Sequence, residues 1–287
     1  MRHYTSRHTV PYLPDVESPT MRNTVNTAVR LAVLGTAALG ATLAHAATTV
    51  TPDQLKVGME STYPPFESYD EKKNIVGSDP DLSRLLAKHM DLKAEFVDTK
   101  FSSLILSLNA GHYDAIISGM YITPERQTQA QTIAYAKTGA AIMVLKDSTV
   151  KPKVPEDLCG LKVGLEKGTT WVAQFNKLST DYCVPNNKGA ISVSEFPSAP
   201  EVTQALLSGN VQAQVEIDGA AGMIAERTKG RVVVSTEHSI YQQTLGIYVK
   251  KGNDALYQAL LKAFDEAKKS GEYAALLKKY NLEEPIN

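Results

Sequence analysis

The chain has 287 residues, of which 43% are hydrophobic and 21% are charged. This composition suits one large or two ordinary globular domains and excludes a chain that stays disordered. The formal net charge is −1, and the part after residue 46 carries 26 basic and 29 acidic residues, a net charge of −3. A balance this close to neutral, on the acidic side, argues against a nucleic-acid partner.

The N-terminus has the features of an export signal. Two arginines precede an apolar run at residues 31–43, and Ala-His-Ala at 44–46 matches a small-residue cleavage site. The apolar run is too short to span a membrane. Met21 is the natural start of such a signal, with residues 1–20 as an upstream segment. We therefore exclude residues 1–46 from the fold and expect a periplasmic protein released from a cleaved signal peptide.

From residue 55 onward the pattern alternates between strands and helices. In the first half we expect strands at 55–60, 93–97 and 113–117 and helices at 80–90 and 101–110. A second half repeats the pattern, because "VTQALLSGNVQAQVEI" has the same helix, glycine stop and strand as "LILSLNAGHYDAIISGM". This alternation predicts an α/β fold with mostly parallel sheets flanked by helices.

The order of these elements predicts two lobes. A Pro- and Lys-rich loop precedes a fresh strand at 161–165, and the chain ends in helices at 254–270 and 272–280 that have no further strand to cover. We expect these last helices to pack on the first half, so that lobe 1 is 47–140 plus 242–287 and lobe 2 is 141–241. Two crossovers, near 138–142 and 238–243, would act as hinges, and the cleft between the lobes is the expected ligand site.

The stretch "YITPER" places an arginine where a helix begins. Thr123 is a typical N-cap, Pro124 suits the first helical position, and Glu125 and Arg126 follow in the first turn. A positive charge there opposes the helix dipole. Binding of a carboxylate by the planar guanidinium would explain that placement, and a surface ion pair of Arg126 with Glu125 or Asp114 is the alternative.

The stretch "EKGTTW" suggests an opposing anion site. Gly168 allows close approach of the backbone, and the N–H groups of Thr169 and Thr170 at a helix start favour an anion. The Lys-Ser/Thr ending of a nucleotide-binding loop is absent from the sequence, which argues against a nucleotide. Trp171 is expected either at the border of the cleft or in the core.

Cys159 and Cys183 are the only two cysteines of the sequence. In an exported chain an even pair predicts a disulfide, and two free buried thiols are the alternative. A metal site would need His or Cys neighbours at ligand spacing, but His89, His112 and His238 are scattered singly. We expect no metal and no cofactor.

Several segments in order along residues 50–285 resemble one family. They are "TYPPFES", "VGSDPDLSRLLAK", "SGMYITPERQ", "LKVGLEKGTTW" and "SGEYAALLKKYNL". Together they resemble the periplasmic solute-binding proteins of polar amino-acid ABC importers, the group with lysine/arginine/ornithine-, histidine- and glutamine-binding members. The resemblance implies the two-lobed periplasmic binding protein fold, joined by two crossover strands. It also implies a monomer that binds an amino acid without a cofactor and delivers it to the membrane permease of an ABC transporter.

The resemblance also implies a set of ligand-binding residues. They are Glu60, Tyr63, Phe101, Ser118, Gly119, Tyr121, Arg126, Gly168, Thr169, Thr170 and Asp218. An ungapped match places Ile217 where the family commonly has the aspartate that holds the ligand's ammonium. A local bulge would restore Asp218 to the site, whereas a shift of one residue turns its side chain to the other face.

Aromatic faces and the Glu60 carboxylate both favour a cation, so we expect a basic amino acid as ligand, with other polar amino acids as the fallback. In the alternative interpretation Glu60 only caps local N–H groups and Phe101 belongs to the core.

A rival function is a periplasmic enzyme on the same fold that resembles cyclohexadienyl dehydratase, with Glu216 as general acid. No sequence motif demands catalysis, so a non-enzymatic carrier is the main hypothesis.

Overall fold

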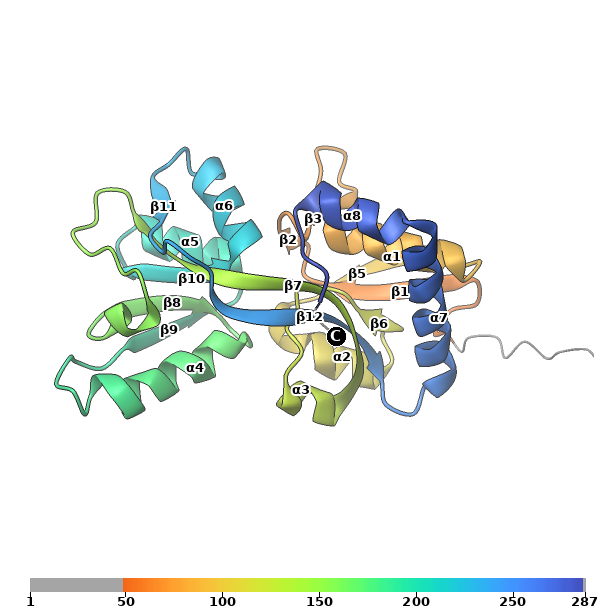
Figure 1. Cartoon of the computed structure of the whole chain (residues 1–287), viewed down its shortest axis with the longest axis horizontal. Helices are drawn as coiled ribbons and strands as arrows, with labels where there is room; N and C mark the ends of the chain where they lie inside the picture. Colours follow the sequence, from red (N-terminus) through yellow and green to blue (C-terminus); the bar gives the residue numbers. More distant parts are fainter. Residues whose placement is uncertain (1–48, 286–287) are drawn as a thin grey trace, which may run out of the picture. The chain divides into compact units, whose positions relative to one another are not determined.

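The computed structural model describes residues 49–285; the expected leader, residues 1–46, lies outside them. Nine strands form one sheet in the order β5-β1-β6-β12-β7-β10-β8-β9, and β11 pairs with β7 (Figure 1). The strands of this sheet are β1 Gln54–Met59, β5 Lys93–Asp98, β6 Ala115–Ile116, β7 Ala130–Leu145, β8 Lys162–Glu166, β9 Ser192–Phe196, β10 Ala213–Ile217, β11 Val232–Val234 and β12 Ile240–Lys250. A small second sheet contains β2 Thr62–Tyr63, β3 Glu67–Tyr69 and β4 Ile75–Val76.

Helices flank this sheet. The α-helices are α1 Ser78–His89, α2 Leu104–Ala110, α3 Pro124–Gln129, α4 Thr170–Leu178, α5 Ala199–Leu207, α6 Asp218–Arg227, α7 Asp254–Ser270 and α8 Glu272–Tyr280. Short helical turns are η1 Phe101–Ser103, η2 Pro155–Leu158 and η3 Ser179–Cys183. The expected strands and helices are therefore present, with bounds that differ by one to three residues at several ends.

The sheet is parallel at both ends and antiparallel in the middle. At one end β1 pairs in parallel with β5 and β6, and at the other end β8 pairs in parallel with β9 and β10. Between them the long strands β7 and β12 run antiparallel and pass side by side from one half to the other (Figure 1). This is the two-lobed α/β fold that the sequence predicts, with β7 and β12 as its two crossover strands.

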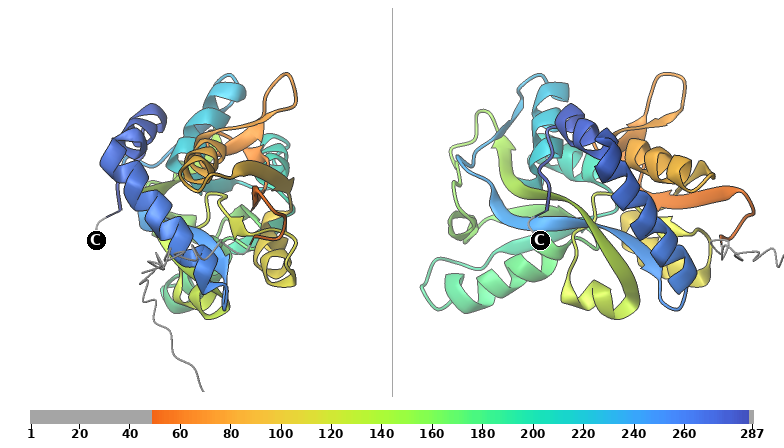
Figure 2. Two further views of the ribbon diagram at one scale, coloured as in Figure 1. Left: turned by 90° about the vertical axis from the view of Figure 1, so that its right-hand side faces the viewer. Right: turned by 45° about the vertical axis from the view of Figure 1, so that its right-hand side comes forward.

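The C-terminal helices belong to the half that contains β1. Helices α7 and α8 pack against α1, and Figure 2 shows them together on that side. Buried Leu256, Leu260 and Phe264 of α7 attach this helix to the main core cluster, which also contains Leu82 and Leu86 of α1. The expectation that the last helices pack back on the first half is confirmed.

Local signals in the sequence explain two of the boundaries near the cleft. Gly111 follows α2 with a left-handed φ of 80°, a conformation in which glycine carries no Cβ penalty. At the start of α3 the Thr123 hydroxyl accepts a hydrogen bond from the backbone N–H of Arg126 at 3.1 Å, and Pro124 occupies the first turn. The predicted N-cap is confirmed.

Cys159 and Cys183 form a disulfide, as the sequence predicts, with their Cα atoms 5.3 Å apart. The bond joins the residue after η2 to the last residue of η3, in the half that contains β8. It closes a loop over a sequence separation of 24 residues. The alternative of two free thiols is wrong.

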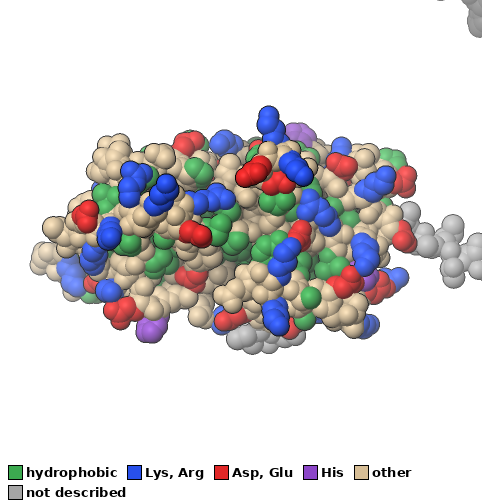
Figure 3. All heavy atoms as spheres, turned by 90° about the horizontal axis from the view of Figure 1, so that it is seen from above, with side chains coloured by type: hydrophobic (Ala, Val, Ile, Leu, Met, Phe, Trp, Pro, Cys, Tyr) green, Lys and Arg blue, Asp and Glu red, His purple; other side chains and the backbone are tan. Residues whose placement is uncertain are grey.

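The described surface carries charges of both signs. Figure 3 shows Lys and Arg side chains interspersed with Asp and Glu on the face it presents, without a large region of one sign. Within residues 49–285, no helix is both long enough and apolar enough to cross a bilayer.

Candidate functional site

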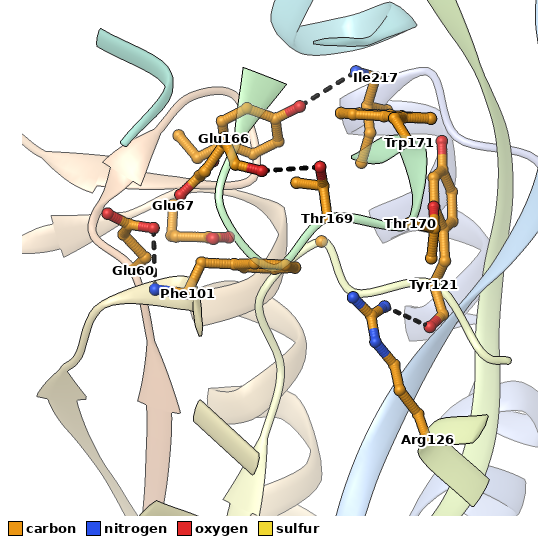
Figure 4. A pocket seen from close by; sticks show the side chains of 12 residues that line it. Glu60, Glu67, Phe101, Tyr121, Arg126, Glu166, Thr169, Thr170, Trp171 and Ile217 are labelled. Atoms are coloured by element: carbon orange, nitrogen blue, oxygen red, sulfur yellow. Dashed lines mark hydrogen bonds between the residues drawn. The ribbon is translucent and has the colours of Figure 1, made fainter. Parts of the chain in front are cut away.

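A cavity of about 400 Å³ lies between the two halves of the sheet. Residues from both halves line it (Figure 4). They are Glu60, Tyr63, Glu67, Phe101, Gly119, Tyr121, Arg126, Glu166, Thr169, Thr170, Trp171 and Ile217. Eight of the eleven residues that the resemblance implies therefore meet at one cavity.

One side of the cavity is lined with carboxylates. Figure 4 shows Glu60, Glu67 and Glu166 on the same side of the Phe101 ring. Glu60 Oε2 accepts the backbone N–H of Phe101 at 3.0 Å, and Glu67 Oε1 accepts the Ser118 hydroxyl at 2.7 Å. Their other oxygens, Glu60 Oε1 and Glu67 Oε2, are buried and have no hydrogen-bond partner within residues 49–285. Glu60 thus caps a local N–H, as the alternative interpretation held, and also leaves one oxygen for another donor.

Glu166 approaches the same place from the other half, at the end of β8. Its Oε1 is also buried without a hydrogen-bond partner in the described chain. Burial, and then the neighbouring Glu60 carboxylate, hold the pKa of Glu166 well above its usual range. Burial and the nearby Asp79 raise the pKa of Glu67 in the same way. These carboxyl groups are therefore costly to ionise together unless a positive charge lies between them.

The opposite side of the cavity carries Arg126. Its Nη1 donates to the Tyr121 carbonyl at 2.7 Å, and its Nη2 donates to the Gly168 carbonyl of the other half at 2.9 Å. Its guanidinium carbon lies 5.6 Å from the centroid of the Phe101 ring. Arg126 is only 8% exposed, and burial lowers the pKa of its guanidinium. The alternative of an exposed arginine in a surface ion pair is therefore wrong.

Two further donors line the cavity. Thr170 Oγ1 and Trp171 Nε1 are buried and have no hydrogen-bond partner in the part of the chain that the structure describes. The Trp171 ring packs edge-on against Tyr121, with centroids 6.0 Å apart. Both residues belong to the first turn of α4, where backbone N–H groups have no partner inside the helix. Trp171 therefore lines the cavity while most of its ring is buried.

Tyr63 connects the two halves directly. Its hydroxyl donates to Glu216 Oε2 at 2.8 Å and accepts the backbone N–H of Ile217 at 3.0 Å. Glu216 also accepts from the Gln214 amide at 2.7 Å and lies behind Tyr63, outside the cavity lining. Burial raises the pKa of Glu216 to about 7. With Arg126 and Gly168, this contact holds the halves together on both sides of the cavity.

Asp218 does not line this cavity, so its place in the ligand site stays a prediction. Strand β10 pairs with β7 without a bulge through Ile217, which faces the cavity, and Asp218 is the first residue of α6. Its carboxylate accepts the Ser239 hydroxyl at 2.6 Å. A shift of one residue in the register of β10 would therefore exchange the apolar Ile217 side chain at the cavity for the Asp218 carboxylate.

Several polar groups near the cavity form hydrogen bonds within the protein. The N–H of Gly119 donates to Asp79 at 2.7 Å, and the Ser118 side chain is used by Glu67 and by the N–H of Glu60. The N–H of Thr169 donates to the Glu166 carbonyl at 3.3 Å. Gly119 and Thr169 still line the cavity, whereas their N–H groups serve the protein itself.

Gly168 has the role expected from its flexibility. It has a left-handed φ of 87°, and a Cβ at this position would lie 2.9 Å from the Cα of Ser102 in the other half. Glycine is therefore required for the two backbones to approach this closely.

Four lining residues were not in the predicted set, namely Glu67, Glu166, Trp171 and Ile217. For Trp171 the sequence allows either the border of the cleft or the core. Glu67 and Glu166 belong to the motifs "TYPPFES" and "LKVGLEKGTTW". For Glu166 the available signal is a carboxylate at the end of a buried strand, whereas Glu67 begins the short strand β3 and has no such signal.

Comparisons with known proteins agree with this geometry. The model of the bacterial extracellular solute-binding proteins, family 3, matches residues 55–283. The chain belongs to this family. It is 43% identical over 119 residues to the ABC transporter arginine-binding protein 1 of Escherichia coli K12. That match covers 41% of this chain and 48% of the relative, so the chain spans about half the length of that curated relative.

Solved structures extend the likeness over the whole fold. An ancestral arginine-binding protein bound to arginine has a TM-score of 0.73 and 35% identity, covering 79% of this chain and 98% of that one. An ancestral amino-acid-binding protein described as a precursor of cyclohexadienyl dehydratase has a TM-score of 0.67 and 31% identity, covering 79% and 95%. The fold is that of the periplasmic binding proteins.

Proposed function

We propose that this protein is an extracytoplasmic substrate-binding protein that captures a basic amino acid and delivers it to the permease of an ABC importer. One observation carries the proposal: the cavity leaves buried donors unpaired at one end and buried acceptors unpaired at the other. Arg126, Thr170 and Trp171 suit the carboxylate of an amino acid. Glu60 and its neighbouring carboxylates suit a cationic side chain, and the arginine-binding relative supports this class of ligand.

Capture occurs by closure of two lobes, 47–140 plus 242–287 and 141–241, which hinge near 138–142 and 238–243. Two features of the second crossover support a hinge there. The pairing of β12 with β7 shifts register between Ile240 and Gln243, and Tyr241 has a φ of 48°, which is unusual for a residue other than glycine. Small-angle scattering should give a smaller radius of gyration with saturating arginine than without it. An unchanged radius would contradict hinge closure.

The carrier acts in the periplasm as a monomer and without catalysis. The apolar segment at 31–43 would export it, and the periplasmic relatives of the family support that location. The monomer is an expectation that sedimentation of the purified protein tests directly, with a single species at the mass of one chain as the expected result.

An enzyme on the same fold is the second candidate. The dehydratase precursor among the similar structures and the raised pKa of Glu166, caused by burial and by Glu60, favour a protonated carboxyl group in the cavity. Glu216, the general acid first considered, lies behind the Tyr63 hydroxyl and outside the cavity lining. Incubation of the protein with the ligand, followed by product analysis, separates the candidates: a carrier returns the ligand unchanged.

Calorimetric titration with each of the twenty amino acids tests the proposed function. We expect tight binding of arginine and weaker binding of the other basic amino acids. Mass spectrometry of whatever copurifies with the protein gives an independent identification. Tight binding of a neutral or acidic amino acid, with no binding of the basic set, would overturn the proposal.

A further inference from the structure

The acidic side of the cavity contains a carboxylate pair that neither half of the molecule supplies alone. Glu60 follows β1 in the first half, and Glu166 ends β8 in the second. Both residues are more than nine-tenths buried, with exposed fractions of 4% and 5%. Each has one carboxylate oxygen with no hydrogen-bond partner within residues 49–285. The two carboxyl groups therefore meet from opposite halves, close enough that Glu60 raises the pKa of Glu166.

The charges around this pair do not balance it. The carboxylates of Glu60, Glu216 and Glu67 all raise the pKa of Glu166, and Glu60 has the largest effect of the three. The nearest lysine, Lys100, has its Nζ 3.9 Å from Glu60 Oε1, but its side chain is 58% exposed and solvent screens it. Arg126 is engaged by two backbone carbonyls on the other side of Phe101. The pair thus has an uncompensated need for positive charge.

The chemistry of the pair favours an organic cation. No three His, Cys, Asp or Glu side chains among the described residues converge as a metal site requires. A guanidinium is planar and has donors on several edges, so it can donate to two carboxylates at once. An ammonium is a compact and more strongly hydrated charge, so it loses more hydration free energy when it is buried. A neutral amide or urea group supplies donors without the charge.

We propose that Glu166 is a specificity-determining residue that pairs with Glu60 across the closed cleft and selects a ligand whose distal group is a guanidinium. The inference rests on the proposed function and deepens it by naming the chemical class of the ligand's side chain. Without a cation between them the two carboxyl groups lie together only with one of them protonated, so a neutral ligand gains no charge-assisted hydrogen bond from the pair.

The test compares arginine with citrulline, which has nearly the same shape and a neutral distal group. In calorimetry at pH 7.5, wild-type protein should bind arginine about a hundredfold or more tightly than citrulline. Loss of one partner of a buried charge pair weakens binding by a factor of this size. Glu166→Gln should weaken arginine binding by about tenfold or more and leave citrulline unchanged or tighter. Glu195→Gln is the matched control, because Glu195 is exposed on β9 beside Leu165 and should change neither affinity.

Thermal unfolding of the ligand-free proteins separates specificity from a structural role. Because burial of the Glu166 carboxyl is unfavourable, Glu166→Gln should unfold at the same or a higher temperature than wild type while binding arginine less well. A variant that loses stability and both ligands equally would show a structural role and overturn the inference. Retained arginine preference in a folded Glu166→Gln would overturn it as well. If wild-type protein binds no basic amino acid, the proposed function itself fails.

Discussion

The two ends of the cavity differ in the kind of polar group that they leave unpaired. Glu60, Glu67 and Glu166 offer acceptors on one side, whereas Thr170 and Trp171, on the half that opposes Glu60, offer donors. The donor end is also anchored by contacts of Arg126 with two backbone carbonyls, whereas like charges destabilise the acceptor end. In the proposed function the donor end would hold the ligand's carboxylate, and the acceptor end would select its side chain.

Arg126→Ala should give the largest effect, because it removes the only charged donor among the residues that line the cavity. Loss of a buried charged partner costs about 2–5 kcal/mol of binding free energy. Since Arg126 also links to the Gly168 carbonyl across the cleft, we expect closure to weaken as well. Calorimetry with arginine measures the loss. Arg84→Ala, an exposed arginine paired with Asp81, is the control and should bind normally. Intact affinity in Arg126→Ala would show that the carboxylate is held elsewhere.

Removing the disulfide should change stability and leave both ends of the cavity intact. Closing a loop of this length stabilises a protein by about 3 kcal/mol in chain-entropy estimates, and the Cys159–Cys183 bond spans 24 residues. Neither cysteine lines the cavity. The double variant Cys159→Ser, Cys183→Ser should therefore unfold at lower denaturant concentration with an unchanged affinity for arginine. Lost affinity in the folded variant would show that the disulfide positions the cavity.

Glu60→Gln sharpens the comparison at the acceptor end. A hydrogen bond to a charged group contributes about 1.5–3 kcal/mol, so arginine binding should weaken by that amount. The amide still accepts the Phe101 N–H through its oxygen, which keeps the local turn in place. Calorimetry with arginine and citrulline gives the readout, and citrulline should be less affected. Equal losses for both ligands would mean that Glu60 acts only through the local structure.

The last expected effect is a pH dependence of stability from Glu216. Burial raises its pKa to about 7 in the folded protein, above the value of about 4.3 that a glutamate has in an unfolded chain. The unfolded state therefore loses this proton first, and the stability that is present below the unfolded value is lost as the pH rises through about 7. Ligand-free protein should unfold at a lower temperature at pH 8 than at pH 5, and Glu216→Gln should reduce this trend, while Glu67, Asp79 and Glu166, whose pKa values burial also raises, keep the rest of it. A trend of the same size in the variant would assign it to other groups.

Local patterns predicted the fold and most of the cavity. Alternating strands and helices, the cap at Thr123 and the glycine stop at Gly111 depend on neighbours in sequence, and the structure confirms them. Arg126 was found because its charge is unfavourable at a helix start. These signals are readable because each depends on a few adjacent residues.

The missed residues depend on contacts between distant parts of the chain. Glu166 is a polar residue at the end of a strand, and its meaning appears only when β8 faces Glu60 across the cleft. Asp218 was expected to line the cavity, but Ile217 lines it instead. The pairing of β10 with β7 continues without a bulge to Ile217, and one residue of register decides which side chain faces inward. Register and closure are set by the whole fold, so a motif does not reveal them.

Competition among three related ligands tests most directly the claim that opposite charges at the two ends select the ligand. Arginine presents both a carboxylate and a guanidinium, citrulline keeps the carboxylate with a neutral distal group, and agmatine keeps the guanidinium without the carboxylate. Calorimetry at pH 7.5 should show arginine bound more tightly than either analogue by about a hundredfold or more, because each analogue leaves one end of the cavity unpaired. Citrulline or agmatine bound as tightly as arginine would contradict the account.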